Sequence, residues 1–471
     1  IQQHLILEIR PRRPDRHQRG AFPLALRQRQ HLVGVTIGDA GLVEGDAVAI
    51  LMENNQHMHA VMWAARRCGL YYVPINTHLT AAEAAYIIDN SSAKAIVGSG
   101  KLTDTLAGLA AELPNGLPPL RVIADGRLDG WQSYPECVTD QPDTPIDDEI
   151  EGDLLQYSSG TTGRPKGIKR ALPHVPPSES PGLMAALVSF WMHPDAVYLS
   201  PAPLYHTAPS VWSMQTQAGG ITTVVMEKFD AEGALDAIAK HRVTHGQFVP
   251  VMFTRMLKLP EEVRTSYDVS SLERVMHAAA PCPVEIKKQM IDWWGPIIDE
   301  YYASSEAHGS TLITAEEWLT HPGSVGRPLA GTLHIVGEDG TELPPGEAGE
   351  IYFEGGFDFE YLNDPDKTAK SRHRHGWKTV GDIGYVDDEG YLYLTDRRHH
   401  MIISGGVNMD MQPMMGGEDF SYMLNERPGA YIFVGNGDTA KLHHPRYDFN
   451  DAVIPTGCAY WVRLIETAMP A

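Results

Sequence analysis

The sequence predicts an α/β protein in which parallel strands alternate with helices, followed by a smaller antiparallel β region. From Gly45 onward, apolar runs of strand length alternate with helix-length segments, at the spacing of right-handed βαβ crossovers. After Gly323 the pattern changes to short strands separated by Gly and Asp turns, which favours an antiparallel sheet. A chain of 471 residues is long enough for two or three domains.

The first βαβ elements are expected in the stretch that follows residue 45. The expected strands are 47–52, 71–75 and 95–97, and the expected helix with apolar residues at helical spacing is 57–68. A second helix should begin after Thr80, because Thr80-Ala-Ala-Glu83 is a capping box. In such a box the hydroxyl and the carboxylate accept hydrogen bonds from the unpaired N–H groups of the first turn.

Later segments continue both patterns. The expected βα alternation runs through 221–225, 231–241 and 247–251, and the expected antiparallel strands are 333–336, 350–353 and 391–394. The segment 140–153 is rich in Pro, Asp and Glu. We expect a solvated connector there, with acidic side chains that are simply exposed.

Composition excludes several classes of protein. The net charge of −22 argues against a nucleic-acid partner, because binding to phosphate backbones needs a basic surface. No apolar run approaches the roughly 20 residues that span a bilayer. The four cysteines lie far apart without a C-x-x-C pair, so neither a zinc knuckle nor a disulfide framework is indicated. These features predict a cytoplasmic protein with reduced, mostly buried thiols.

The segment 157–167, Tyr-Ser-Ser-Gly-Thr-Thr-Gly-Arg-Pro-Lys-Gly, has the composition of a loop that binds a polyphosphate. Its hydroxyl donors are Ser158, Ser159, Thr161 and Thr162, and its glycines are Gly160, Gly163 and Gly167. Glycines let backbone N–H groups approach anionic oxygens, and Lys166 adds a positive charge. The spacing differs from the Walker loop, because Gly160 and Gly163 are too close together and Gly167 follows the lysine.

This loop resembles the phosphate loop of the adenylate-forming acyl-CoA synthetase (AMP-binding) family, and the resemblance extends over about residues 41–408. The segment Tyr302-Ala-Ser-Ser-Glu306 is similar to the family pattern Tyr-Gly-x-Thr-Glu. The resemblance implies that Tyr302 stacks on adenine, Ser305 donates to the α-phosphate and Glu306 binds Mg²⁺. An aromatic face, a short hydroxyl and a hard anionic oxygen suit these roles. It also implies catalytic roles for Lys166 and Glu306.

Further segments extend the resemblance to adenine and ribose. Ala278-Ala-Ala-Pro281 is similar to the small-residue segment on the other adenine face, with Ala280 beside the base. In the segment 376–384, Asp382 lies between glycines and would accept from two ribose hydroxyls. Arg397 would contact ribose, and His399 would hold the pivot of the family's hinge.

Pro203-Leu-Tyr-His-Thr-Ala-Pro209 resembles the family segment that gates the acyl tunnel, and His206 is the matching position. The alternative is that His206 is an ordinary core histidine. Three neighbours could line a pocket for a lipid-like chain or belong to the core: Val211, Trp212 and Met214.

The resemblance implies a large adenylate-forming N-terminal domain of layered parallel sheets with helices and a small β subdomain. It also implies an AMP-forming acyl-CoA ligase that activates a fatty or other apolar carboxylic acid, with ATP, Mg²⁺ and coenzyme A. The carboxylate and the α-phosphate are both anions, so catalysis consists mostly of charge neutralisation and positioning.

After Asn408 the sequence departs from this family. Segments such as Leu442-His-His-Pro-Arg-Tyr-Asp resemble the C-terminal end of metal-dependent aminoacylases and hippurate hydrolases, which are amidohydrolases. That resemblance implies a metal ligand at His443. Because a catalytic metal needs three or more protein ligands, and the family's other ligands are not evident upstream, a solvated loop that binds metal weakly is the better interpretation.

The predicted organisation therefore has four parts. They are an unmatched Arg-rich head at 1–33, an AMP-binding domain at 34–395, a hinge at 396–408 and an amidohydrolase-like fragment at 409–471, a short α/β tail in place of the usual mobile C-terminal domain. We interpret the chain as a fusion, natural or arising at an assembly junction, whose ligase activity is impaired. The alternatives are a catalytically inactive nucleotide-binding fusion protein and a metal-dependent amidohydrolase.

Overall fold

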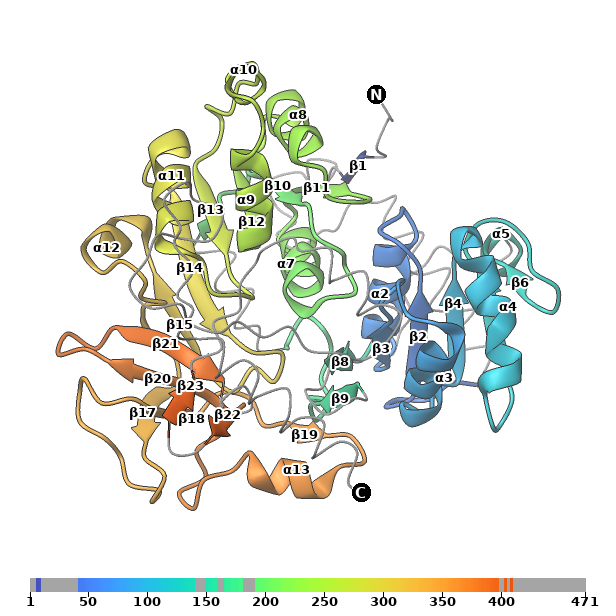
Figure 1. The fold of residues 1–471 in the computed structure, drawn as a ribbon. Coiled ribbons are helices and arrows are strands. Elements are labelled where there is room, and N and C mark those ends of the chain that lie inside the picture. The colour runs from blue at the N-terminus through green and yellow to red at the C-terminus, as the bar shows by residue number, and fades with distance from the viewer. Residues whose placement is uncertain are drawn as a thin grey trace, which may run out of the picture. The chain divides into compact units, whose positions relative to one another are not determined.

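The computed structural model describes residues 6–9, 41–139, 149–158, 165–180, 191–397, 402–404 and 407–409. The chain divides into two compact units, Ile1–Met411 and Gln412–Ala471. The second unit lies outside the described residues, and so do His399, His443 and the predicted α/β tail. The fold below is that of the first unit (Figure 1).

A six-stranded parallel sheet forms the N-terminal part of this unit, with strand order β6-β5-β4-β2-β3-β7. Its strands are β2 (Ala47–Leu51), β3 (Tyr71–Pro74), β4 (Ala95–Gly98), β5 (Leu120–Ile123), β6 (Gln132–Ser133) and β7 (Asp153–Leu154). Its helices are α2 (Met58–Arg67), α3 (Ala81–Asn90), η1 (Gly100–Leu102), α4 (Thr103–Glu112) and α5 (Tyr134–Val138). The strands and helix expected between residues 47 and 97 are confirmed.

The predicted capping box at the start of α3 is also confirmed. The Thr80 hydroxyl accepts from the backbone N–H of Glu83 at 3.3 Å, and the Glu83 carboxylate accepts from the backbone N–H of Thr80 at 2.8 Å. Side chains of β2 alternate between two hydrophobic clusters. Val48 and Ile50 pack with α2, whereas Ala49 and Leu51 pack with α3 and α4. Burial on both faces explains why this strand is apolar throughout.

An eight-stranded sheet follows, with order β1-β11-β10-β12-β13-β14-β15-β16. Its strands are β1 (Ile6–Ile9), β10 (Val197–Ser200), β11 (Thr222–Met226), β12 (His245–Phe248), β13 (Arg274–His277), β14 (Ile298–Ala303), β15 (Ser310–Ile313) and β16 (Arg327–Ala330). Its helices are α7 (Thr207–Ala218), α8 (Ala231–His241), α9 (Pro250–Leu257), α10 (Glu261–Arg264), α11 (Val284–Trp294) and α12 (Ala315–Thr320). Strands β10 to β14 pair in parallel. The strand expected at 247–251 lies two residues earlier, because Pro250 starts α9.

Three smaller antiparallel sheets complete the described unit. The four-stranded sheet β17-β18-β20-β21 confirms the predicted antiparallel region, and a three-stranded sheet has the order β19-β9-β8. The strands are β17 (Thr332–Val336), β18 (Gly349–Glu354), β20 (Asp382–Val386), β21 (Leu392–Arg397), β8 (Gln156–Ser158), β9 (Lys166–Lys169) and β19 (Glu360–Tyr361). Helix α13 (Pro365–Lys370) follows β19, and β22 (Ile402–Ser404) pairs with β23 (Val407–Met409).

The acidic connector is not simply a solvated segment. Residues 140–148 lie outside the described part, but Glu151 is only 4% exposed and forms an ion pair with Arg66 of α2. Asp153 forms an ion pair with Arg170 at 2.8 Å. The expectation that these acidic side chains are merely exposed is therefore wrong at its C-terminal end. The reason is that arginines from neighbouring segments compensate their burial.

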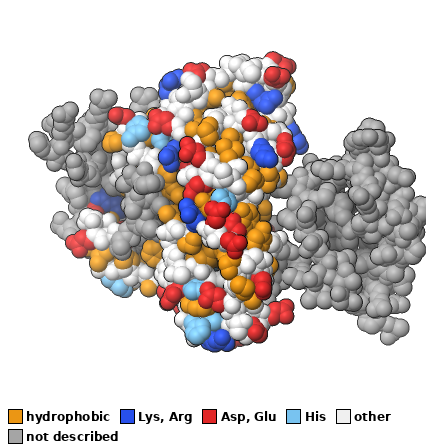
Figure 2. Space-filling view, turned by 90° about the vertical axis from the view of Figure 1, so that its left-hand side faces the viewer, with side chains coloured by type: hydrophobic (Ala, Val, Ile, Leu, Met, Phe, Trp, Pro, Cys, Tyr) orange, Lys and Arg blue, Asp and Glu red, His pale blue; other side chains and the backbone are white. Residues whose placement is uncertain are grey.

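Acidic and basic side chains lie close together on the face shown in Figure 2, with hydrophobic side chains between them. Within the described ranges, no helix is long and apolar enough to cross a membrane. Three cysteines lie in these ranges, and each is of intermediate exposure. They are Cys68, Cys137 and Cys282.

Candidate active site

The two ends of the predicted phosphate loop form an antiparallel hairpin. Ser158 at the end of β8 lies directly opposite Lys166 at the start of β9. Five predicted loop residues lie outside the described part of the chain: Ser159, Gly160, Thr161, Thr162 and Gly163. Gly167 is needed for packing rather than for a turn, because a Cβ atom there would lie 3.0 Å from the Tyr157 ring and 3.2 Å from Leu362 Cβ.

Tyr302 and Asp382 meet although they are far apart in the sequence. The Tyr302 hydroxyl, at the end of β14, donates to Asp382 Oδ2, at the start of β20, at 2.7 Å. The two residues are 8% and 7% exposed. The backbone of Arg397 in β21 lies opposite Asp382 in register. The structure thus brings together the residue predicted for adenine with the two predicted for ribose.

Ser305 and Glu306 lie in the turn that follows β14. Ser305 Oγ shares a hydrogen bond of 2.7 Å with Thr207 Oγ1, on the first residue of α7. The Glu306 carboxylate is 8% exposed and accepts a 2.8 Å hydrogen bond from the Tyr361 hydroxyl of β19. Ala307 has a φ of 54°, an uncommon conformation for a residue with a side chain. The strained turn fixes the predicted Mg²⁺ ligand immediately before it.

His206 lies at the N-cap position of α7, and its ring centroid is 4.7 Å from that of Tyr205. Burial lowers the pKa of His206 below its ordinary value, so the ring is neutral at pH 7. The residue as a whole is exposed, which does not fit the alternative of an ordinary core histidine. The gating role stays a prediction.

The predicted small-residue segment forms an exposed turn after β13. Ala279 has a φ of 74°, and Ala279 and Ala280 are both exposed. The turns after β10, β13 and β14 carry His206, Ala280 and Glu306, respectively. These strands are parallel and belong to one sheet, so the three turns share its carboxyl edge. In open α/β sheets ligands bind at that edge.

Tyr361 and Lys367 belong to the same site and were missed by the sequence analysis. Burial, followed by the positive charge of Lys166 beside it, lowers the pKa of Lys367 to about 8. The segment Tyr361-Leu-Asn-Asp-Pro365, in which Asp364 caps a helix that begins at Pro365, was the available signal. It was missed because β19 has only two residues, too few to be read as a strand.

A buried ion cluster lies behind the adenine-side segments. Lys287 Nζ of α11 is 2.8 Å from Glu300 Oε2 of β14, and His277 Nε2 of β13 is 3.2 Å from the same oxygen. Burial lowers the pKa of Lys287 and of His277. Burial would raise the pKa of Glu300, but His277 and Lys287 oppose this and the net pKa is lowered. The cluster joins the base of the 278–281 turn to the strand that carries Tyr302.

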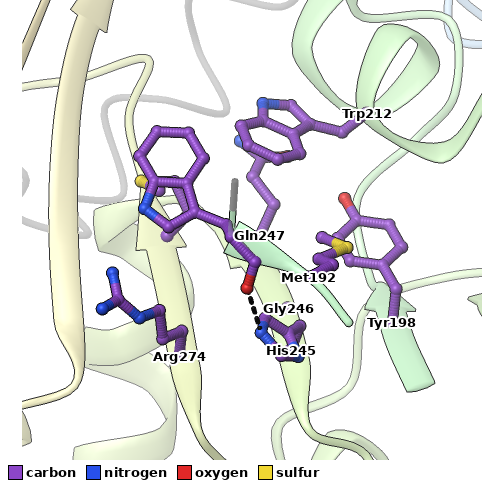
Figure 3. A pocket seen from close by; sticks show the side chains of 9 residues that line it. Met192, Tyr198, Trp212, His245, Gly246, Gln247 and Arg274 are labelled. Carbon is purple, nitrogen blue, oxygen red and sulfur yellow. Dashed lines mark hydrogen bonds between the residues drawn. The ribbon is translucent and has the colours of Figure 1, made fainter. Parts of the chain in front are cut away.

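A small cavity of about 10 Å³ lies on the other side of this strand, with room for about one water molecule. It is lined by Trp191, Met192, Tyr198, Trp212, His245, Gly246, Gln247, Arg274 and Met276. Tyr198 and Trp212 approach it from one side and Arg274 from the other (Figure 3). Trp212 Nε1 donates to the Tyr301 hydroxyl at 3.1 Å, which ties the cavity wall to β14. Of the three possible pocket residues, Val211 and Met214 pack in the core instead.

The donors present fit Mg²⁺ only in combination with a substrate. Among the described residues, no group of three or more His, Cys, Asp or Glu side chains could hold a metal ion. Mg²⁺ is commonly held by one or two carboxylates together with substrate phosphates and water. Glu306, which lies near Lys367, fits that mode. His443 lies outside the described residues.

Comparisons with curated proteins find several CoA ligases. The long-chain-fatty-acid–CoA ligase FadD13 of Mycobacterium tuberculosis is 31% identical over 375 residues, which is 78% of this chain and 72% of that protein. A feruloyl-CoA synthase from Amycolatopsis sp is 32% identical over 375 residues, 79% of this chain and 72% of that protein. These names agree with the predicted enzyme class, an acyl-CoA synthetase.

Solved structures agree on the fold. The amide bond synthetase McbA from Marinactinospora thermotolerans superposes with a TM-score of 0.70 and 26% identity, over 81% of this chain and 76% of that one. ATP-bound MatB from Rhodopseudomonas palustris gives a TM-score of 0.66 and 26% identity, over 81% and 75% of the two chains. The predicted adenylate-forming architecture is confirmed.

Two family models match the chain. The model of peptidase family M20/M25/M40 matches residues 393–467, which agrees with the predicted change of resemblance near residue 409. The model of the AMP-binding enzyme matches residues 25–358. Because that match covers more than half of the sequence and the relatives above align over most of it, this chain belongs to the AMP-binding enzyme family.

Proposed function

We propose that the chain is an AMP-forming acyl-CoA ligase that activates an apolar carboxylic acid. The observation that carries the proposal is the hydrogen bond between Tyr302 and Asp382, together with the carboxylate of Glu306 in the turn after the same strand. An aromatic face next to a hydrogen-bond acceptor supports a site for a base and its sugar, and a hard anionic oxygen in the following turn supports a metal-bound phosphate.

In this proposal Tyr302 and Ala280 contact adenine, Asp382 and Arg397 contact ribose, and Lys166 with Ser158 contacts the phosphates. The substrate carboxylate attacks the α-phosphorus and diphosphate leaves, which gives an acyl-adenylate. The CoA thiol then attacks the acyl carbon, loses its proton and displaces AMP. Glu306 would hold Mg²⁺, which supplies neutralisation of phosphate charge when bound, and Ser305 donates to the α-phosphate.

The proposed acyl partner is an apolar acid, because aromatic and methionine side chains dominate the cavity behind β14. A cavity of about 10 Å³ is too small for an acyl chain as it stands. Met192 and Met276 are unbranched and adapt readily, so their movement would open the space. In this proposal His206 lies between the phosphates and the cavity and gates entry.

We further propose that thioester formation by this chain is slow. In the acyl-CoA synthetase family, a lysine from the mobile C-terminal domain bridges the substrate carboxylate and the phosphate. Residues 393–467 instead match the M20/M25/M40 model. One cation would then be missing where two anions meet, and the wall that guides the thiol would differ.

The test of the class is exchange of labelled diphosphate into ATP that depends on an added carboxylic acid. The wild-type chain should catalyse it with medium- or long-chain or aromatic acids. Lys166→Ala should reduce exchange by about 10- to 100-fold, because a charge-assisted contact to phosphate is lost. Lys169→Ala is the matched control on the same strand and should leave exchange unchanged.

The alternatives predict other results. A catalytically inactive nucleotide-binding protein would bind ATP by calorimetry without any acid-dependent exchange. Hydrolysis of N-acyl amino acids with Mn²⁺ or Zn²⁺ and without ATP would favour the amidohydrolase. Equal ATP affinity in the wild type and in Lys166→Ala would contradict the phosphate-binding assignment itself.

A further inference from the structure

Strand β19 fixes a distant segment of chain beside the predicted phosphate-binding strand. It pairs antiparallel with β9, so that Tyr361 lies opposite Ile168. The next residue, Leu362, donates its N–H to the carbonyl oxygen of Gly167 at 2.8 Å. The backbone that leads to α13 is therefore bonded to the residue directly after Lys166.

The backbone of Lys367 is fixed in turn. The Asp364 carboxylate caps α13 and accepts from the N–H of Lys367 at 3.0 Å. Thr368 Oγ1 accepts from the N–H of Tyr361 at 2.9 Å, which ties the helix back to β19. Helix α13 is short, but these contacts hold it in one place relative to β9.

The Lys367 side chain points back toward the site. Its Nζ atom lies 3.7 Å from the centroid of the Tyr361 ring, and the hydroxyl of that ring donates to Glu306. The positive charge of Lys166 acts on this ammonium group and lowers its pKa. Two ammonium groups so close repel each other. Among the described residues, neither lysine has a carboxylate oxygen within ion-pair distance.

A pair of cations held together in this way is stabilised by an anion that contacts both. A single carboxylate is a weak candidate, because Glu306 already accepts from Tyr361 and its remaining capacity suits a metal ion. A polyphosphate carries several charges and many acceptor oxygens, and charge-assisted contacts to it are strong. The AMP portion, in contrast, would lie at Tyr302 and Asp382, which do not belong to this pair.

We propose that Lys367 is a second cation for the diphosphate end of ATP, which binds a β- or γ-phosphate oxygen opposite Lys166 and stays with diphosphate as it leaves. This inference rests on the proposed function and adds a binding residue to it. It requires that Lys367 acts on ATP and on diphosphate but not on AMP.

The test measures binding by calorimetry to the full chain, with Mg²⁺–ATP, Mg²⁺–diphosphate and AMP as separate ligands. Lys367→Met keeps an unbranched side chain over Tyr361 and removes the charge. This variant should bind ATP and diphosphate about 10- to 100-fold more weakly than the wild type, and its affinity for AMP should change by less than about twofold. Lys367→Arg should retain most of the affinity for ATP. The control Lys370→Met, on the exposed side of the same helix, should bind all three ligands like the wild type.

The outcomes separate the two proposals. If the wild type binds ATP and Lys367→Met binds it as tightly as Lys370→Met does, the inference about Lys367 is wrong and the proposed function stands. If Lys367→Met loses affinity for AMP and for diphosphate equally, Lys367 has a structural role, and the inference that it binds diphosphate is wrong. A wild-type chain that binds neither ATP nor diphosphate would overturn the proposed function together with the inference.

Discussion

Replacing Lys287 with methionine should reduce the free energy of unfolding by about 3–5 kcal/mol, the usual cost of removing one partner from a buried ion pair. The Lys287 side chain is 0% exposed, and its Nζ lies 2.8 Å from Glu300 Oε2, which belongs to a side chain 6% exposed. Methionine keeps the contact of the stem with Trp318, over which Nζ now lies at 4.7 Å. Burial lowers the pKa of His277 below its ordinary value, so His277 is a weaker cation than the lysine that it would have to replace.

The loss of stability in Lys287→Met should be smaller at low pH than at high pH. In the wild type the folded-state pKa of Glu300 is lowered. The ionised carboxylate therefore adds to the free energy of unfolding above its unfolded pKa of about 4.3. This stabilisation is lost as the pH falls through the folded-state pKa. Without Lys287, burial dominates and the folded pKa of Glu300 should be raised instead. Protonation then favours the folded state, and the destabilisation should be smaller at pH 5 than at pH 8.

The assay is urea unfolding followed by tryptophan fluorescence, since Trp294 and Trp318 are buried near the cluster. Lys288→Met, an exposed neighbour on the same helix, is the matched control and should change stability by less than about 0.5 kcal/mol. The double variant Lys287→Met/Glu300→Gln should recover much of the loss, because no buried charge is left unpaired. A loss below about 1 kcal/mol for Lys287→Met alone would refute the reasoning.

Two further predictions concern the cavity and the tail. Gln247→Met should raise the free energy of unfolding by about 1–2 kcal/mol in the same assay, because both polar atoms of this buried amide lack a hydrogen-bond partner in the structure; a less stable variant would contradict this. Replacing residues 409–471 with a synthetase C-terminal domain should raise the rate of acyl-CoA formation by about 10²–10³. A starting chain that already matches this chimera would show that the tail is not a non-catalytic graft.

Local patterns made much of the fold predictable. The capping box at Thr80 and the apolar runs at 47–52 and 71–75 depend only on near neighbours in the chain. The burial of Glu151, Glu300 and Lys287 was not predictable in the same way. In a sequence a charged residue looks the same whether it is solvated or compensated by a partner that is distant in the chain, and only the folded contacts distinguish the two.

The residues of the candidate site also differ in how far the sequence could predict them. Tyr302, Glu306 and Asp382 were found because their short segments resemble a known family, not because their spacing indicates a contact. Tyr361 and Lys367 have no comparable signal, since their place depends on how a two-residue strand pairs with β9. Sequence reasoning thus found the residues that sit in recognisable motifs and missed those that tertiary pairing brings to them.

The site is assembled across three sheets, and two tyrosine hydroxyls make the connections. Tyr302 in the eight-stranded sheet donates to Asp382 in the four-stranded sheet, and Tyr361 in the three-stranded sheet donates to Glu306. A carboxylate accepts several hydrogen bonds, so each acid can keep the hydrogen bond from its tyrosine while it also contacts a ligand. A nucleotide that contacts both acids would therefore reinforce the junctions between the sheets, and its binding free energy would add to their stability. Both acids are largely buried, 7% exposed for Asp382 and 8% for Glu306, as residues at junctions between sheets should be.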